Sequence, residues 1–186
     1  MITPGELKKG IAIELDDQPW TVVDYQHVKM GRGGAVVRIK VRNLRSGYTT
    51  ERTFPASERF RRIYLEKRSV QFLYRDEGTY HFMDTDNFEQ LPLSADQIGD
   101  DAGYLKENLV CSLLMYNDQP IALELPVTVD LKVEYAEPGF KGDTATGGNK
   151  PATLETGLRV NVPLFVETGD VIRIDTRTGQ YLERVT

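Results

Sequence analysis

The sequence is poor in the side chains that most often bind metals or form disulfides: its 186 residues include one cysteine and two histidines. The single Cys111 excludes an internal disulfide and is typical of proteins from a reducing compartment. His27, His81 and that cysteine do not make up the nitrogen and sulfur ligand set of a zinc site. We therefore expect no bound metal and no other cofactor.

Long apolar runs are missing as well. The sequence has no run of about 18 apolar residues that could span a membrane. Its N-terminus, Met1–Glu6, lacks the basic and then apolar layout of a secretory signal. No pairing of His, Asp, Ser or Cys typical of a catalytic centre is visible either. The sequence predicts a cytoplasmic protein that is not an enzyme and has no membrane partner.

Acidic residues outnumber basic ones, 28 to 23, which gives a net charge of −5, but the charge is unevenly distributed. Residues 1–64 carry a net charge of +5, residues 65–127 carry −8, and residues 128–186 carry −2. A basic end on an acidic chain indicates that one part faces phosphates while another avoids them. Scatter among solvated faces is the alternative interpretation, and charge alone does not separate the two.

Short alternating strands separated by turn residues predict an all-β fold. The same pattern of turn, strand, polar turn and strand begins near Leu7, near Leu105 and near Thr168. Together with the shifts in composition it predicts an elongated string of three small β-barrels, with domains 1–64, 65–127 and 128–186. One large β-sandwich is the alternative. The best helical candidates are residues 57–64 and residues 94–98, the latter with a serine cap.

The most conspicuous segment is the predicted hairpin tip at residues 28–35. Strands expected on both sides would bring the flanking residues together and leave Arg32 at the end of an arm. Seven residues per strand at about 3.3 Å each give a reach of roughly 20 Å. Glycine accepts the positive φ of tight turns and leaves no side chain to obstruct a partner. The segment holds two basic residues and three glycines: Lys29, Gly31, Arg32, Gly33 and Gly34. A plain glycine-rich turn is the alternative.

Basic residues continue along the strand that leaves the tip. Arg38, Lys40 and Arg42 alternate with aliphatic residues, so period two places the cations on one face. Such a face can follow a phosphate backbone. An edge strand that uses charge to prevent aggregation is the alternative. Arg59, Arg61 and Arg62 add a second basic patch; a solvated helix face is the alternative.

The longest irregular stretch covers residues 138–157. Loops of this length tend to be functional or disordered. Its segment Gly142, Asp143 and Thr144 is small and rich in hydrogen-bonding groups, which suits a shape-dependent contact. The C-terminal region also carries a distinctive pattern of residues: Lys150, Ala152, Gly157, Val160, Val162, Pro163, Val166 and Gly169.

On this pattern the sequence closely resembles bacterial elongation factor P over essentially its whole length. The resemblance implies an SH3-like (KOW-type) barrel followed by two OB-folds in an L shape. It implies a monomer that binds the 70S ribosome, its rRNA and ribosomal proteins, between the peptidyl and exit tRNA sites. There the factor positions peptidyl-tRNA and relieves stalling at consecutive prolines. The archaeal and eukaryotic relative, initiation factor 5A, is shorter by one OB-fold.

The resemblance also assigns roles to residues. Arg32, Gly31, Gly33, Gly34 and Lys29 would approach the CCA end of peptidyl-tRNA; Arg38, Lys40 and Arg42 would contact tRNA or rRNA backbone; and Gly142, Asp143 and Thr144 would contact the exit-site mRNA codon. Many family members have lysine at the tip and proline two residues earlier, where this sequence has Arg32 and Met30. Arginine excludes lysine-specific modification and leaves rhamnose, added by an arginine rhamnosyltransferase, or no modification. A paralogue with another stalling preference and a generic single-strand-binding OB-fold protein are the alternatives.

Overall fold

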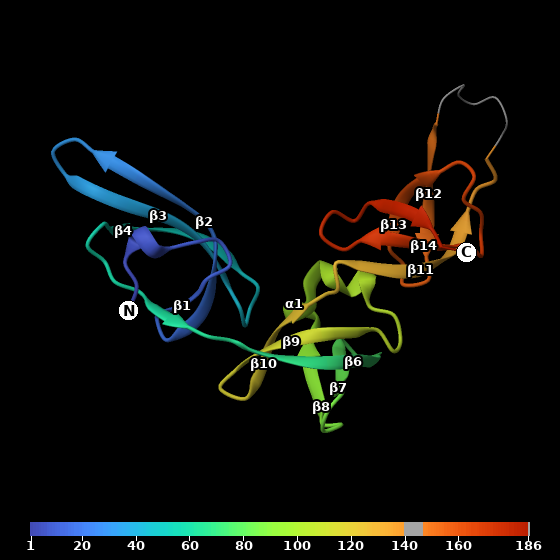
Figure 1. Cartoon of the computed structure of the whole chain (residues 1–186), viewed down its shortest axis with the longest axis horizontal. Helices are drawn as coiled ribbons and strands as arrows, with labels where there is room; N and C mark the ends of the chain where they lie inside the picture. Colours follow the sequence, from blue (N-terminus) through green and yellow to red (C-terminus); the bar gives the residue numbers. More distant parts are fainter. Residues whose placement is uncertain (140–146, 186) are drawn as a thin grey trace. The chain divides into compact units, whose positions relative to one another are not determined.

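The structure, a computed structural model, describes residues 1–139 and 147–185. Strands dominate it and form three five-stranded sheets (Figure 1). The all-β prediction is confirmed, and the three sheets differ from the two facing sheets of a single large sandwich. Among the described residues, no helix has the length and apolar character needed to cross a membrane.

The first sheet follows a 3-10 turn, η1 (Pro4–Glu6), and has the strand order β4-β3-β2-β1-β5. Its strands are β1 (Ala12–Leu15), β2 (Gln18–Met30), β3 (Gly34–Asn43), β4 (Thr49–Pro55) and β5 (Arg61–Ile63). The core of this part is aliphatic and aromatic, because alternate residues of each strand point inward. It includes Ile13, Trp20, Val22, Val37, Ile39, Val41 and Phe60.

The second sheet has the order β10-β9-β6-β7-β8. Its elements are β6 (Glu66–Asp76), β7 (Thr79–Asp84), β8 (Gln90–Ser94), α1 (Ala95–Ile98), η2 (Gly99–Tyr104), β9 (Val110–Tyr116) and β10 (Gln119–Glu124). The predicted helix at residues 94–98 is confirmed, with Ser94 as N-cap accepting a hydrogen bond from the Gln97 backbone N–H. Burial raises the pKa of the Cys111 thiol in β9 to about 12, so this thiol stays protonated.

The third sheet has the order β13-β12-β11-β14-β15. Its strands are β11 (Thr128–Ala136), β12 (Asn149–Leu154), β13 (Arg159–Pro163), β14 (Val171–Asp175) and β15 (Tyr181–Arg184). The chain forms two compact units, residues 1–68 with 114–122 and residues 69–113 with 123–186. The expected domain boundaries at residues 64 and 127 stay a prediction.

Two hairpin turns explain the first two copies of the repeated sequence pattern. Asp16 and Asp17 join β1 to β2, and Asn117 and Asp118 join β9 to β10. All four residues have positive φ, between 50° and 61°. Two central residues with positive φ define a type I′ turn, whose twist matches the flanking strands. Asn and Asp tolerate this conformation better than other residues with a side chain.

The prediction of a helix at residues 57–64 is wrong. Arg61–Ile63 forms strand β5, which pairs with β1, and Phe60 forms a β-bridge with Ile2. The extended chain buries Phe60 and Ile63. It also pairs with the backbone N–H and C=O groups at the edge of β1, which a helix here would leave without partners. The basic group is therefore not a helix face. Arg61 lies 3.3 Å from the Glu14 carboxylate, and Arg62 lies over the ring of Tyr64.

Candidate functional site

The predicted arm exists as the hairpin of β2 and β3. The two strands pair from Trp20 opposite Asn43 to Met30 opposite Gly34, with a register shift between Val22 and Asp24. Residues 31–33 form the loop between the strands, and Gly34 with φ +85° follows it. A loop of three residues followed by a residue of positive φ is a common hairpin connection.

A third strand supports most of the arm. Strand β4 pairs with β3 from Arg42 opposite Thr49 to Val36 opposite Pro55, and the Ala56 N–H then donates to the Ala35 carbonyl. Only the last residues of the hairpin therefore extend beyond β4. The reach of roughly 20 Å expected for seven free residues per strand is shortened by this pairing. The tip is consequently a short projection from a three-stranded part of the sheet.

The three tip glycines have two different roles in the geometry. Gly34 needs its positive φ, which is unfavourable for a residue with a side chain. Gly31 and Gly33 do not have positive φ. A Cβ added at any of the three would meet no atom within 4 Å. Internal packing therefore does not require glycine at positions 31 and 33, and their effect is to leave the flanks of Arg32 bare.

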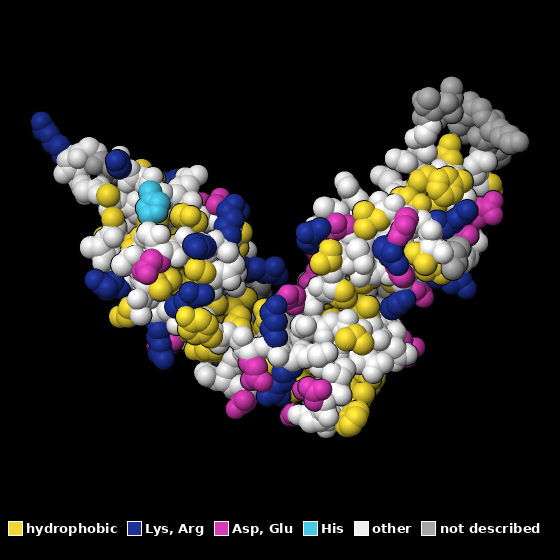
Figure 2. All heavy atoms as spheres, viewed as in Figure 1, with side chains coloured by type: hydrophobic (Ala, Val, Ile, Leu, Met, Phe, Trp, Pro, Cys, Tyr) yellow, Lys and Arg dark blue, Asp and Glu magenta, His cyan; other side chains and the backbone are white. Residues whose placement is uncertain are grey.

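Arg32 is exposed between these glycines, and Lys29 is exposed on β2 just before the loop. Figure 2 shows a basic side chain projecting from the far end of the hairpin. Within the part of the chain that the structure describes, the Arg32 guanidinium makes no hydrogen bond or ion pair. Its five N–H donors are thus available to a partner.

The alternation predicted for β3 is confirmed. Val37, Ile39 and Val41 are fully buried, while the three intervening basic residues, Arg38, Lys40 and Arg42, are exposed on the opposite face. Strand β3 lies between β4 and β2 in the sheet, so the edge-strand interpretation is wrong. These cations therefore do not protect a free sheet edge.

Acidic residues partly neutralise this basic face. Arg38 lies 3.3 Å from the Glu51 carboxylate. Lys40 faces Asp24 on one side and Glu51 on the other in the strand register. These residues line a shallow hollow of about 220 Å³. Lys29 and Arg32 at the tip make no ion pair with the described residues. Contact of the β3 face with an RNA backbone stays a prediction.

The predicted codon-contacting residues Gly142, Asp143 and Thr144 lie outside the described residues. The chain on either side of them is described. The buried Lys150 at the start of β12 donates a hydrogen bond of 2.5 Å from Nζ to the carbonyl of Glu137, the residue that follows β11. Gly139 lies so close to Leu164 that an added Cβ would be 2.5 Å from its carbonyl oxygen.

The C-terminal sequence pattern is largely a pattern of core and turn residues. Ala152, Val160, Val162 and Val166 are buried in the third sheet's core. Gly157 and Gly169 both have positive φ. The pattern therefore specifies this sheet and its turns, and its relation to function is indirect.

Sequence reasoning did not single out a polar hollow on the outer face of the third sheet, which includes Arg159 and Asn161. The available signal was the alternation of these two residues with Val160 and Val162. Among the described residues, no group of three or more His, Cys, Asp or Glu side chains is placed to hold a metal ion.

The glycine geometry predicts opposite outcomes for two matched variants. Gly34→Ala should lower the free energy of unfolding by about 1–2 kcal/mol, because alanine is strained at positive φ. Gly33→Ala should leave it within about 0.5 kcal/mol, since its Cβ would enter open space. Urea unfolding followed by the fluorescence of Trp20, the single tryptophan, measures both. Equal losses in the two variants would contradict this assignment.

The comparison with solved structures concerns the fold. The fold is similar to that of eukaryotic translation initiation factor 5A from Methanococcus jannaschii, with a TM-score of 0.51 and 22% sequence identity. The match covers 67% of this chain and 93% of that one. This likeness shows a shared fold over the part of the chain that the match covers.

Family comparisons make the assignment specific. Residues 3–60 match the elongation factor P KOW-like domain, residues 65–123 match the elongation factor P OB domain, and residues 129–184 match the elongation factor P C-terminal family. The chain is 53% identical over 184 residues to elongation factor P from Moorella thermoacetica and 51% identical over 185 residues to that from Natranaerobius thermophilus. These alignments cover 99–100% of this chain and 98–100% of the relatives.

The chain therefore belongs to the elongation factor P family and is a translation elongation factor. The SH3-like and OB-fold prediction is confirmed by this assignment together with the three sheets. Membership of the family implies the ribosome as a partner.

Proposed function

We propose that the chain binds the ribosome between the peptidyl and exit tRNA sites and stimulates peptide-bond formation at consecutive prolines. Family membership over the full chain supports this position and substrate. The observation that carries the proposal is the bare tip. Arg32 is exposed, and Cβ atoms at Gly31 and Gly33 would meet open space. A tip without flanking side chains can enter a narrow RNA site and approach a tRNA end closely.

Arg32 acts by contact and not by chemistry. Its guanidinium presents a permanent charge and a planar set of donors that fit phosphate and ribose oxygens. Proline is a poor acceptor and a constrained donor, so orientation limits the rate of its incorporation. Holding the CCA end of peptidyl-tRNA in a productive position lowers the entropic part of the barrier. The factor supplies no catalytic group in this mechanism and is not an enzyme.

The remaining contacts extend the same proposal. Lys29 assists the tip, while Arg38, Lys40 and Arg42 contact tRNA or rRNA backbone. The segment Gly142, Asp143 and Thr144 contacts the exit-site mRNA codon. The factor acts as a monomer in the cytoplasm, and an arginine rhamnosyltransferase is its further partner if Arg32 is modified.

A reconstituted translation system tests the proposal. Adding the chain should increase the yield of a reporter containing three consecutive prolines and leave a matched reporter with three alanines unchanged. Stimulation of both reporters alike, or of neither, would contradict the proline-specific function. A paralogue with another stalling preference would instead relieve pauses at other motifs, which ribosome profiling of a deletion strain identifies.

A further inference from the structure

A pocket of about 380 Å³ lies in the second compact unit, residues 69–113 with 123–186. Strands β6 and β7, the turn η2 with the residues that follow it, and the turn between β12 and β13 supply its lining. Its volume is in the range of roughly 300–1,000 Å³ typical of ligand sites. We call it the aromatic pocket, because the buried rings of Phe72 and Tyr80 line it.

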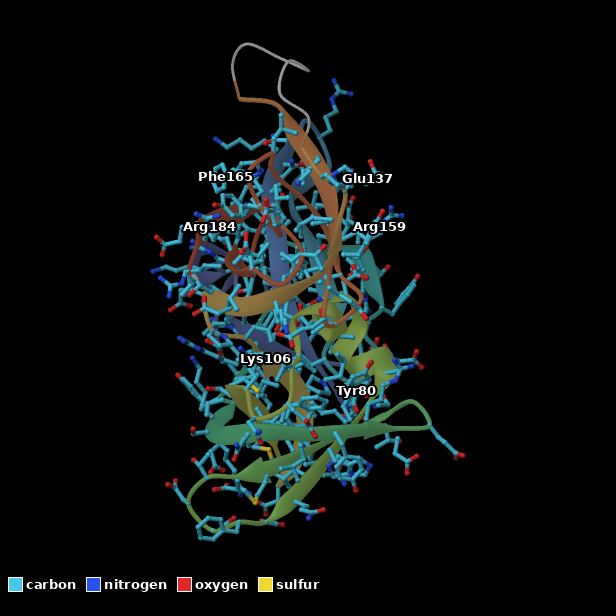
Figure 3. All side chains as sticks on the ribbon, turned by 90° about the vertical axis from the view of Figure 1, so that its right-hand side faces the viewer. Tyr80, Lys106, Glu137, Arg159, Phe165 and Arg184 are labelled. Carbon is cyan, nitrogen blue, oxygen red and sulfur yellow. The ribbon has the colours of Figure 1, made fainter. Side chains whose placement is uncertain are left out.

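The aromatic pocket is apolar at its base. Phe72 and Tyr80 have ring centroids 6.0 Å apart, and the buried Leu105 adds a third apolar side chain. Figure 3 shows Tyr80 next to the helical turn η2, whose residues Ala102 and Gly103 also line the pocket. An apolar ring of a ligand that enters the pocket would leave water and contact aromatic rings, which is favourable.

A β-bulge directs a cation to this base. Between Phe72 and Tyr74 the register with β7 shifts, so that Leu73 is an extra residue of β6. Beyond the bulge Arg75 is opposite the buried Tyr80, and opposite residues of an antiparallel pair share a face of the sheet. Without the extra residue, Arg75 would lie on the other face.

The two charged groups of the aromatic pocket are available to a ligand. The Arg75 guanidinium lies over the Tyr80 ring, 5.5 Å from its centroid. Stacking uses the face of the guanidinium and leaves the N–H donors in its plane free. Arg75 and Glu107 are both exposed, and neither forms an ion pair with the described residues. Among the described lining residues, Arg75 is the one cation and Glu107 the one anion.

Contacts within the same compact unit fix one wall of the pocket. The Thr156 hydroxyl donates a hydrogen bond to the Gly103 carbonyl. A Cβ added to Gly103 would lie 3.0 Å from Cδ1 of Leu158, so a larger residue would be crowded here. This wall is therefore formed without a ligand, and binding requires little ordering of the chain.

We propose that the aromatic pocket binds a free α-amino acid whose side chain carries an apolar ring. The Arg75 guanidinium holds the ligand carboxylate through two parallel N–H donors. Glu107 accepts hydrogen bonds from the ligand ammonium group. The ring of the ligand contacts Phe72 and Tyr80. Such a ligand carries one anion, one cation and one apolar surface, which match the cation, the anion and the apolar base of the pocket.

Two other classes of ligand fit this lining less well. A nucleotide would bring several negative charges, whereas the lining supplies one cation and residues 65–127 carry a net charge of −8. The C-terminus of a peptide has the carboxylate and the side chain of an amino acid, but it has no ammonium group for Glu107. The proposal does not depend on the action of Arg32, which belongs to the other compact unit.

Isothermal titration calorimetry of the full chain with L-phenylalanine tests the site. We expect saturable binding at one site with a Kd below about 1 mM. L-Phenylalaninamide lacks the carboxylate and N-acetyl-L-phenylalanine lacks the ammonium group, so each should bind at least about 5-fold more weakly. L-Alanine lacks the ring and should bind at least about 10-fold more weakly. Equal affinity for N-acetyl-L-phenylalanine would assign the pocket to peptide C-termini and overturn the proposal.

Matched variants place the binding in the aromatic pocket. Arg75→Gln should weaken the binding of L-phenylalanine by about 10-fold, and Glu107→Gln by about 5-fold. Lys132→Gln and Glu134→Gln remove a cation and an anion that are exposed on β11, outside the pocket. Each of these two controls should change the affinity by less than about twofold. Arg32→Ala should bind L-phenylalanine as the wild type does, so failure of the tip and failure of the pocket are distinguishable. Absence of saturable binding, or equal losses in the Arg75→Gln and Lys132→Gln proteins, would overturn the proposal.

Discussion

Arg32→Ala is expected to abolish the stimulation of tri-proline synthesis while leaving the fold intact. The side chain has no partner among the described residues, so its removal costs no internal contact. Loss of a charge-assisted interaction with RNA should lower the stimulated rate by about 10- to 100-fold. Arg32→Lys keeps the charge but loses the planar set of donors, so its rate should fall between the rates of the wild-type and Arg32→Ala proteins. Single-turnover peptide-bond formation on the tri-proline reporter measures these rates.

Two controls make this result specific. Arg45→Ala removes another exposed arginine, from the turn after β3, and should leave the rate unchanged. The thermal midpoints of all variants should agree, and the Arg32→Ala protein should still bind ribosomes through its remaining surface. A wild-type rate for Arg32→Ala would show that the tip arginine does not position the tRNA end.

The largest expected effect on stability is that of Phe60→Ala. Phe60 is only 2% exposed, packs edge-to-face on Phe54 with ring centroids 5.1 Å apart, and exchanges two backbone hydrogen bonds with Ile2. Truncation of a buried phenylalanine costs about 3–5 kcal/mol through lost burial and the cavity left behind. Because small units are only marginally stable, this loss should unfold much of the first sheet and with it the base of the arm.

Urea unfolding followed by Trp20 fluorescence measures this loss, since Trp20 lies in the same core. Tyr48→Ala is the matched control, because Tyr48 is 64% exposed, and it should change the free energy of unfolding by less than about 0.5 kcal/mol. A loss below about 1 kcal/mol for Phe60→Ala would contradict the role of Phe60 in this core.

The sequence predicts those features that depend on local pattern. Alternation along β3 identifies the buried face of Val37, Ile39 and Val41, and Ser94 marks the start of α1. Residues 57–64 show the limit of local pattern. Phe60 and Ile63 fit a helical spacing, but pairing with β1 and Ile2 decides their conformation.

In the candidate site, too, local features are predictable from the sequence and contacts between separate strands are not. The sequence places Arg32 at the tip, because turn residues and flanking strands are local signals. It does not show that β4 shortens the free arm or that Glu51 lies beside Arg38, since these contacts join separate strands. The hollow around Arg159 depends on residues from three segments, and only the folded sheet brings them together.

The bracing of the arm by β4 has a mechanical consequence. From Arg42 to Val36 each residue of β3 has a paired strand on both sides, and the Ala56 N–H still donates to the Ala35 carbonyl. Closer to the tip, where Met30 pairs with Gly34, the hairpin has only two strands. The hydrogen bonds of two-stranded segments with few buried contacts open locally at a low free-energy cost. Residue pairs that pack on the core open only when the whole sheet unfolds. The hairpin is therefore rigid at its base and more flexible toward its tip. The base fixes the direction in which the tip approaches a partner, and the last residue pairs adjust to the surface of that partner.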